Sequence, residues 1–197
     1  LFIYSNGENK GALFNMINVL SKATGEFLVY STDQDSINAS AVTDFKTFLL
    51  SDQNISCGYC EFQPKPNVEN ELFTKGYDAV SKVGYLARHP SGYFFNREIL
   101  ETTNYLTRFS DYDFVDLFPF EFIFAELAFM GNAAVFNKQL NIPETTGKIV
   151  SKNKSSTTNG TSSKAFFTPT SRLKMAINYT KHINQLELSL SEKKRLM

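Results

Sequence analysis

The sequence predicts an α/β domain in which a mostly parallel, Rossmann-like sheet is flanked by helices, with a helical extension at the C-terminus. The main observation is that apolar runs of strand length alternate with segments of helical periodicity, which is the pattern that βαβ units produce. A second is the apolar run at residues 27–30, which is typical of a strand covered on both faces. The third is length, because 197 residues are enough for one such domain with a sizeable core.

The first predicted unit is a strand, a helix and a second strand. Residues 11–24 are predicted to form an amphipathic helix that Gly25 ends. Its apolar residues recur three and four positions apart and are Leu13, Met16, Ile17 and Leu20. The helix connects strands predicted at residues 1–4 and 26–31, which a right-handed crossover makes a parallel pair. Since the chain starts inside a strand and without Met, we expect further residues before Leu1.

The later elements follow from the same periodicities. The sequence predicts helices at 41–50, after Asn96, at 120–130 and from Ser171, and strands at 55–62, 82–87 and 133–136. Residues 147–161 are mainly Ser, Thr, Asn and Lys, a composition typical of a flexible linker or lid. We therefore divide the chain into a domain at 1–146, a polar linker or lid at 147–170 and a C-terminal amphipathic helix at 171–197.

Composition argues against several classes of partner and setting. The chain has 20 Lys and Arg and 20 Asp and Glu, so no overall charge indicates a nucleic-acid partner. No apolar run reaches the ~18 residues of a membrane span, and we expect no secretory leader. A cytoplasmic location is therefore predicted. The basic residues at 193–195 fit either the dipole of the last helix or peripheral contact with an anionic membrane.

Two carboxylates, Asp33 and Asp35, follow the strand predicted at residues 26–31. Ligands of open α/β sheets collect beyond the carboxyl ends of the strands, so acidic side chains there are placed for a cation or a ribose hydroxyl. Two carboxylates at i and i+2 can share one divalent ion that neutralises a diphosphate. An acidic turn is the structural alternative, because Asp and Ser are common turn residues.

The order of motifs around these carboxylates resembles family-2 glycosyltransferases, which have the GT-A fold. A loop that starts at Asn6, has the sequence N-G-E-N-K-G and contains an N-x-G motif is followed by the predicted helix, by A-T-G-E at 23–26, by the apolar strand and by the D-x-D motif. The resemblance extends over residues 1–141, is specific at 6–35, and implies that an N-terminal portion of the family's domain is lacking here. It implies a GT-A-like fold and transfer of a sugar from a nucleoside-diphosphate sugar to a saccharide or lipid-linked saccharide acceptor, in envelope or capsular polysaccharide synthesis. The implied location is the cytoplasmic face of the plasma membrane.

The resemblance also implies roles for individual residues. Asp35 is expected to bind Mn²⁺ or Mg²⁺ directly, and Asp33 to lie near the ribose or the metal. Asn6 and Lys10 match the loop that faces the nucleotide. A further set is expected near the donor sugar and consists of His89, Ser91 and Gly92.

The catalytic base is left open between Glu121 and Asp116. In inverting members of the family the base is an Asp in an acidic pair that opens a helix, and this pair is absent here at its usual spacing. Glu121 and Asp116 are the nearest carboxylates. A carboxylate such as Glu121 in a first helical turn is also stabilised by the helix dipole without any catalytic role.

Two other functions are alternatives to the transferase. One is a non-catalytic domain that binds sugar or nucleotide. The other is a thiol oxidoreductase that uses the C-x-x-C motif of Cys57 and Cys60. The motif lies in a predicted strand rather than at a helix start, which favours reduced, buried thiols instead.

Overall fold

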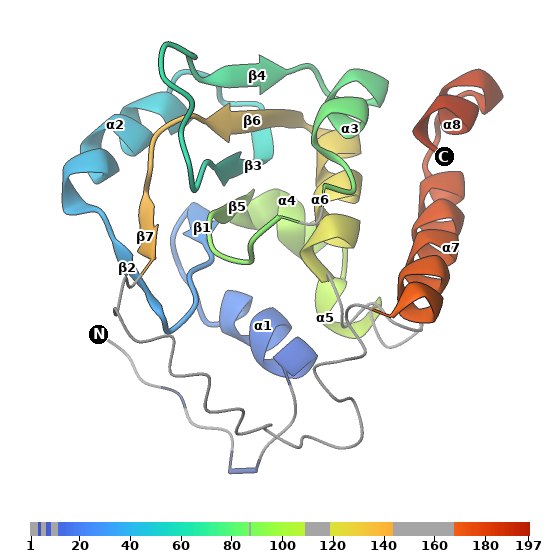
Figure 1. Cartoon of the computed structure of the whole chain (residues 1–197), viewed down its shortest axis with the longest axis horizontal. Helices are drawn as coiled ribbons and strands as arrows, with labels where there is room; N and C mark the ends of the chain where they lie inside the picture. Colours follow the sequence, from blue (N-terminus) through green and yellow to red (C-terminus); the bar gives the residue numbers. More distant parts are fainter. Residues whose placement is uncertain (1–3, 5–6, 9–11, 87, 109–118, 144–167) are drawn as a thin grey trace.

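The computed structural model describes residues 4, 7–8, 12–86, 88–108, 119–143 and 168–197. Its centre is a five-stranded sheet with the order β1-β5-β3-β6-β4 (Figure 1). The strands are β1 (Phe27–Val29), β3 (Ile55–Cys60), β4 (Glu71–Phe73), β5 (Tyr93–Asn96) and β6 (Asn132–Phe136). A separate antiparallel ribbon is formed by β2 (Asp35–Ile37) and β7 (Asn141–Pro143).

Three of the five central strands run in the same direction. β3 and β6 are parallel neighbours, and β5 lies antiparallel between β1 and β3, so β1, β3 and β6 share one direction. β4 is antiparallel to β6 at the opposite edge from β1. The predicted α/β class with a GT-A-like sheet flanked by helices is confirmed. The parallel partner expected for β1 at residues 1–4 falls mostly outside the described residues, and Tyr4 is not in a strand.

Helices cover both faces of this sheet (Figure 1). They are α1 (Ala12–Leu20), α2 (Ala39–Leu49), α3 (Tyr77–Val83), α4 (Arg97–Thr102), α5 (Tyr105–Arg108), α6 (Pro119–Met130), α7 (Pro169–Gln185) and α8 (Leu190–Leu196). On one face α6 packs directly on β3 and β6, α3 lies beside α6 and contacts β6 and β4, and α7 packs on α6. On the other face α2 packs through Phe45 and Phe48 on Phe94 and Phe136.

The strand β3 lies at the centre of the core and is buried along its whole length. Cys57 and Tyr59 belong to the larger hydrophobic cluster under α6, whereas Ile55 and Cys60 belong to the smaller cluster under α2. This explains why the strand has a continuous apolar pattern instead of an alternating one. Gly58 is required here, because a Cβ atom would collide with the Phe94 ring and with the carbonyl oxygen of Ala134.

Two sequence predictions are corrected by the fold. Residues 82–87 were predicted as a strand, but Val83 ends the helix α3, whose Ala79, Val80 and Val83 are buried at helical spacing. The single helix predicted from Ser171 is two helices. Thr168 caps α7, and a capping box between Ser189 and Glu192 starts α8 after a break.

Candidate functional site

The carboxyl ends of β1, β3 and β6 lie on one edge of the central sheet, and β5 begins at the same edge because it runs in the opposite direction. The loop after β1 and the loop before β5 are joined there by backbone hydrogen bonds. The N–H of Tyr30 donates to the Tyr93 carbonyl at 2.8 Å, and the N–H of Gly92 donates to the Tyr30 carbonyl at 3.0 Å. Residues 31–35 and 89–92 therefore face each other at the edge where ligands of α/β sheets bind.

Asp35 is held between these two loops. Its Oδ2 accepts hydrogen bonds from the Thr32 hydroxyl at 2.7 Å and from the Ser91 hydroxyl, and its side chain is 4% exposed. The Ser91 hydroxyl oxygen also accepts from the N–H of Thr32 at 2.9 Å. By contrast, Asp33 is exposed to solvent. The predicted carboxylate pair thus consists of one fixed, nearly buried group and one accessible group.

His89 lies next to Asp35 at the surface. Its Nδ1 accepts from the N–H of Ser91 at 3.3 Å and is 4.0 Å from Asp35 Oδ2, while its side chain is 47% exposed. The ring also packs on Phe62, which follows β3, with 4.6 Å between the ring centroids. The structure therefore brings together four residues, Thr32, Asp35, His89 and Ser91, which we call the Asp35 cluster. Sequence reasoning predicted three of them and missed Thr32.

Gly92 has a backbone reason for being glycine. Its φ of +106° lies in the region that side chains rarely adopt, and a Cβ would lie 2.7 Å from the Cys60 carbonyl oxygen. Gly92 thus lets the start of β5 approach the end of β3. It shapes the loop that carries His89 and Ser91.

The ribbon of β2 and β7 brings Asn141 to the loop after β1. The buried Asn141 donates from Nδ2 to the Ser31 hydroxyl at 3.0 Å, and its Oδ1 has no hydrogen-bond partner within the described part of the chain. Sequence reasoning missed Asn141 because a strand of three residues gives no periodic signal.

Glu121 is fully buried in the first turn of α6. Its carboxylate accepts from the Tyr93 hydroxyl at 2.6 Å and from the N–H groups of Leu86 and Arg88, both at 3.3 Å. Burial and the Glu121 carboxylate both raise the pKa of Tyr93, so that hydroxyl remains a donor. Glu121 therefore fixes the chain just before His89 and does not meet solvent in this structure.

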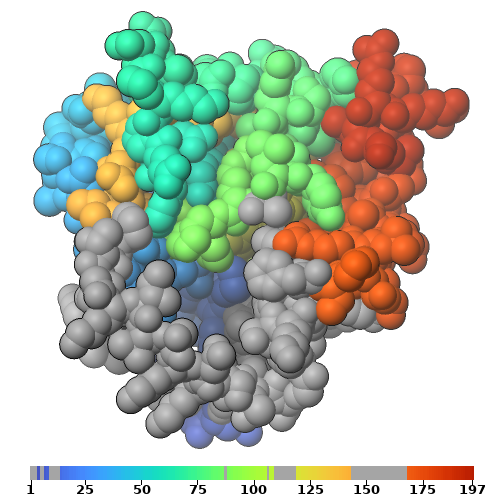
Figure 2. All heavy atoms as spheres, in the orientation of Figure 1, coloured from blue at the N-terminus to red at the C-terminus, as the bar shows by residue number. Residues whose placement is uncertain are grey.

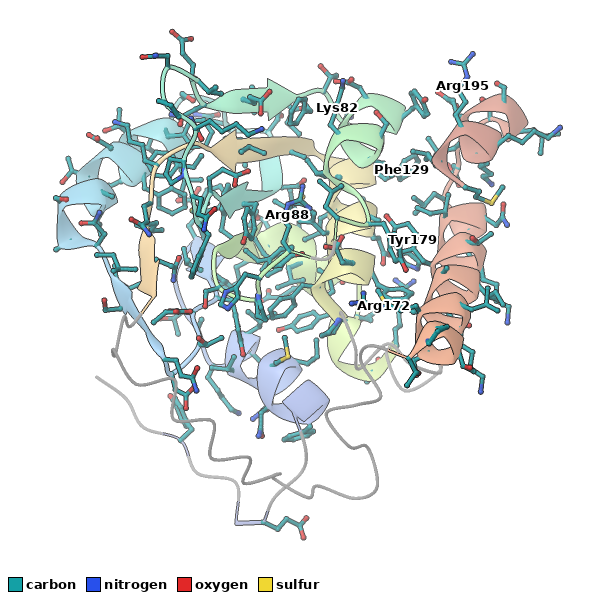
Figure 3. The ribbon with its side chains drawn as sticks, viewed as in Figure 1. Lys82, Arg88, Phe129, Arg172, Tyr179 and Arg195 are labelled. Carbon is teal, nitrogen blue, oxygen red and sulfur yellow. The ribbon has the colours of Figure 1, made fainter. Side chains whose placement is uncertain are left out.

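Arg88 lies between the central sheet and α6 (Figure 3). Its guanidinium is 5.3 Å from the ring centroids of both Tyr59 and Phe124, and it donates to the Val83 carbonyl at 2.5 Å. The Tyr59 hydroxyl in turn donates to the carbonyl of His89 at 3.3 Å. Side chains from β3 and α6 thus hold the segment that leads to the Asp35 cluster.

The site offers carboxylate and hydroxyl oxygens, the ligand type that suits Mg²⁺ or Mn²⁺, together with the imidazole of His89. Within the described residues there is no group of three or more His, Cys, Asp or Glu side chains that could hold a metal ion. Mg²⁺ in particular is commonly bound by one or two carboxylates together with substrate phosphates and water. Asp33 and Asp35 offer carboxylate oxygens of this kind, and Oδ2 of Asp35 already accepts two hydroxyl hydrogen bonds.

Three predicted site residues lie outside the described residues. They are Asn6, Lys10 and Asp116. Their predicted roles stay predictions.

The cysteines do not form a reactive pair. Cys57 and Cys60 form no disulfide, and their side chains are buried in the hydrophobic clusters on opposite faces of the sheet. Burial raises the pKa of the Cys57 thiol to about 12, and it raises the pKa of Cys60 as well. The thiol oxidoreductase alternative has no support from this geometry.

Comparison with solved structures supports a glycosyltransferase-like fold. The S. aureus TarS 1–349 fragment in complex with UDP matches with a TM-score of 0.58 at 10% identity, over 91% of this chain and 47% of that chain. A second crystal structure of S. aureus TarS 1–349 matches with a TM-score of 0.54 at 12% identity and the same coverage. The chain thus spans about half the length of the solved structures it matches.

Comparison of the sequence with protein-family models and with curated proteins finds no match. Among the described residues, no helix combines the length and apolar character needed to cross a membrane.

Proposed function

We propose that the chain is part of a nucleotide-sugar-dependent glycosyltransferase that moves a sugar from a nucleoside-diphosphate sugar to an acceptor hydroxyl. The observation that carries this proposal is the position of the D-x-D motif, at the carboxyl end of β1 in a glycosyltransferase-like fold. The similar TarS structure is in complex with UDP. We therefore propose a uridine nucleotide as the donor's carrier.

The Asp35 cluster contributes residues to the proposed donor site. Asp35 is oriented by the hydroxyls of Thr32 and Ser91, and Asp33 is accessible beside it. A Mg²⁺ or Mn²⁺ ion held by these two carboxylates would stabilise the charge that develops on the leaving diphosphate. The exposed His89 is placed to donate to a diphosphate oxygen or a sugar hydroxyl. Asn6 and Lys10 are proposed to contact the nucleotide.

The proposed acceptor is a saccharide or a lipid-linked saccharide in envelope or capsular polysaccharide synthesis. Its hydroxyl requires a base, and a base must first be within reach of the proton that it removes. Glu121 is buried and accepts three hydrogen bonds, which suits a positioning role for the segment before His89. We therefore favour Asp116 over Glu121 as the base.

Calorimetric titration of the full-length protein with UDP, GDP, CDP and dTDP, each with and without Mn²⁺, tests the donor proposal. We expect UDP to bind, and to bind more tightly when Mn²⁺ is present. Absence of binding by every nucleotide would overturn the proposal, and metal-independent binding would remove the assigned metal role.

A non-catalytic domain that binds sugar or nucleotide is the second candidate. The burial of Glu121 favours it, because this carboxylate is not free to accept a proton from an acceptor. Sugar transfer measured on the full-length protein with Asp116→Asn distinguishes the two functions. A transferase loses turnover while it retains UDP binding, whereas a binding domain shows no turnover in the unmodified protein either.

A further inference from the structure

The outer surface of α7 and α8 carries exposed apolar side chains. Ile177 of α7 is 47% exposed and Leu190 of α8 is 69% exposed. Leu173 of α7 and the C-terminal Met197 are exposed as well. These helices form an outer layer along one side of the molecule (Figure 2). In α7 this is not the exposure of a frayed end, because the opposite face of the helix is packed in the core, whereas α8 has no buried residue.

Basic side chains share this surface with the apolar ones. In α7, Ile177 and the exposed Lys181 are four residues apart and therefore lie on the same face. In α8 the exposed pair Leu190 and Lys194 has the same spacing. An amphipathic surface of aliphatic and Lys side chains is typical of helices that lie in a membrane interface.

Charge is distributed unevenly along a chain that is neutral overall. Residues 144–197 contain ten Lys and Arg and three Asp and Glu, which gives a net charge of +7. Residues 1–143 contain ten Lys and Arg and 17 Asp and Glu, which gives a net charge of −7. Within α7, α8 and their flanks, residues 168–197 contain six basic and two acidic residues. Figure 3 shows Lys82 of α3 towards the same end of the molecule as Arg195 of α8, and α3 contacts α8. Within the described residues, α7, α8 and their flanks thus carry an excess of basic side chains.

We propose that the outer surface of α7 and α8 docks on an anionic phospholipid bilayer. Lysine side chains would bind lipid phosphates while Leu173, Ile177 and Leu190 enter the headgroup region. This pairing of a basic surface with an anionic one gives the charge complementarity that selects the partner. Two copies of this surface would repel each other, which disfavours a homodimer through it. Single-stranded nucleic acid is disfavoured because the exposed apolar side chains are aliphatic and offer no ring on which a base could stack.

The capping of α8 supports a rigid docking surface. The Ser189 hydroxyl accepts from the N–H of Glu192, while the Glu192 carboxylate accepts from the Ser189 N–H at 2.8 Å. In addition, Lys193 donates to the Asn184 carbonyl at 2.8 Å and so ties α8 to the end of α7. The packed helix α7 is therefore formed before any membrane is met, and the capping box and the Lys193 contact reduce the ordering of the α8 backbone that docking requires.

Vesicle co-sedimentation of the 197-residue chain, or of the full-length protein, tests the proposal without any nucleotide. We expect binding to vesicles that contain phosphatidylglycerol, weak binding to pure phosphatidylcholine vesicles, and a decrease in binding as salt is raised. The variant I177S/K181Q/L190S/K194Q should bind anionic vesicles at least about tenfold more weakly, because it lacks two basic and two apolar contacts.

A control lies on α2, on a different side of the molecule (Figure 1), and it removes one apolar and one basic side chain, half as many as the docking variant. Val42 is 43% exposed and is four residues before the exposed Lys46, so V42S/K46Q makes the same kind of change on another helix. Circular dichroism checks that both variants are folded. Equal loss of binding in the two variants, or equal binding to neutral and anionic vesicles, would overturn the proposal. The proposal would also be overturned if soluble heparin competed with vesicles for the protein and I177S/L190S left heparin binding unchanged. That result would identify a site for polyanions instead of a membrane surface.

Because no nucleotide is present, the outcome does not depend on the transferase proposal. Vesicle binding without UDP binding leaves the docking surface intact and removes the proposed enzyme, and the reverse result removes only the surface.

Discussion

Glu121 lies in the first turn of a helix, yet its partners come from elsewhere in the chain. Two are backbone N–H groups of residues 86 and 88, and the third is the Tyr93 hydroxyl. A buried carboxylate is tolerated when such donors replace the water that it has lost. Glu121 therefore joins α6, β5 and the segment before the Asp35 cluster at one point.

Replacing Glu121 with Gln tests this positioning role. The amide presents one acceptor and one donor, so at least one N–H donor of the segment loses its partner. We expect the free energy of unfolding, measured in urea, to fall by about 2 kcal/mol. In E121Q, KM for the donor should rise more than kcat falls, because the segment that carries His89 is less well held. Unchanged stability combined with complete loss of kcat would instead identify Glu121 as the base.

The two cysteine thiols should be unreactive in the folded protein. With a pKa of about 12, Cys57 is a thiolate in only about one molecule in ten thousand at pH 8. Ellman's reagent should therefore leave the native protein unmodified for hours and react with both thiols at once in urea. Glutathione at the same concentration serves as the reactive control. Rapid reaction of the native protein would restore a redox function as a candidate.

His182 should make stability fall as the pH is lowered. Burial holds its pKa below the usual value of 6.5, and its Nε2 lies 3.0 Å from the Phe122 carbonyl oxygen, to which the neutral ring can donate. The folded protein then binds fewer protons than the unfolded chain. Stability is fully present above about pH 6.5 and is lost as the pH falls from there towards the folded pKa.

Urea unfolding of wild type and His182→Gln at about pH 7.5 and about pH 5.5 measures this contribution. One proton accounts for at most about 1.4 kcal/mol per pH unit. The Gln variant should be less stable at the higher pH and should show a smaller loss on acidification. Identical losses in both proteins would exclude His182 as the source.

At the scale of whole elements, the sequence predicted those with a long periodic or apolar pattern. The helices α2 and α6 and the strands β3 and β6 were predicted within two residues of their observed bounds, whereas α1 ends at Leu20, four residues before its predicted end. The strands β2, β4 and β7 have three residues each, too few for alternation to be visible, and they form because a neighbouring strand supplies hydrogen bonds. The error at α3 has a similar cause. Its helical burial depends on packing against α6, which no local pattern specifies.

Ser91 links two of these elements, and its removal should separate them. The Ser91 hydroxyl, in the loop before β5, donates to the carboxylate of Asp35 and accepts from the N–H of Thr32, which both belong to the segment after β1. We expect Ser91→Ala to lower the unfolding free energy by about 1–3 kcal/mol, because the part-buried N–H of Thr32 loses its acceptor. UDP affinity should fall as well, since Asp35 is no longer oriented. Ser36 of β2 is exposed and provides a control, and S36A should change neither quantity.

At the scale of the whole molecule, the site combines residues that the sequence separates widely. Asp33 and Asp35 could be predicted because they follow an apolar strand, and the structure places His89 and Ser91 of another segment beside Asp35. Asn141 could not be predicted, since it reaches Ser31 only through the pairing of β2 with β7. Local patterns thus identify groups at strand ends, whereas groups that a distant ribbon contributes require the fold.

The two aspartates should respond differently to replacement by Asn, because only one of them supports the fold. Asp35 accepts two hydroxyl hydrogen bonds in a nearly buried position, whereas Asp33 is exposed. In the full-length protein, UDP with Mn²⁺ at a hundred times its Kd should add about 2.7 kcal/mol to stability, and EDTA should remove the metal-dependent part. Asp33→Asn should lose much of this increment, and the thermal midpoint of the unliganded protein should stay unchanged. Asp35→Asn should also lose the increment, and in addition the thermal midpoint of the unliganded protein should fall. Asp44→Asn removes only an exposed pair with Lys138 and controls for the change in charge. If both variants keep the full metal-dependent increment, the cation is not held by this pair.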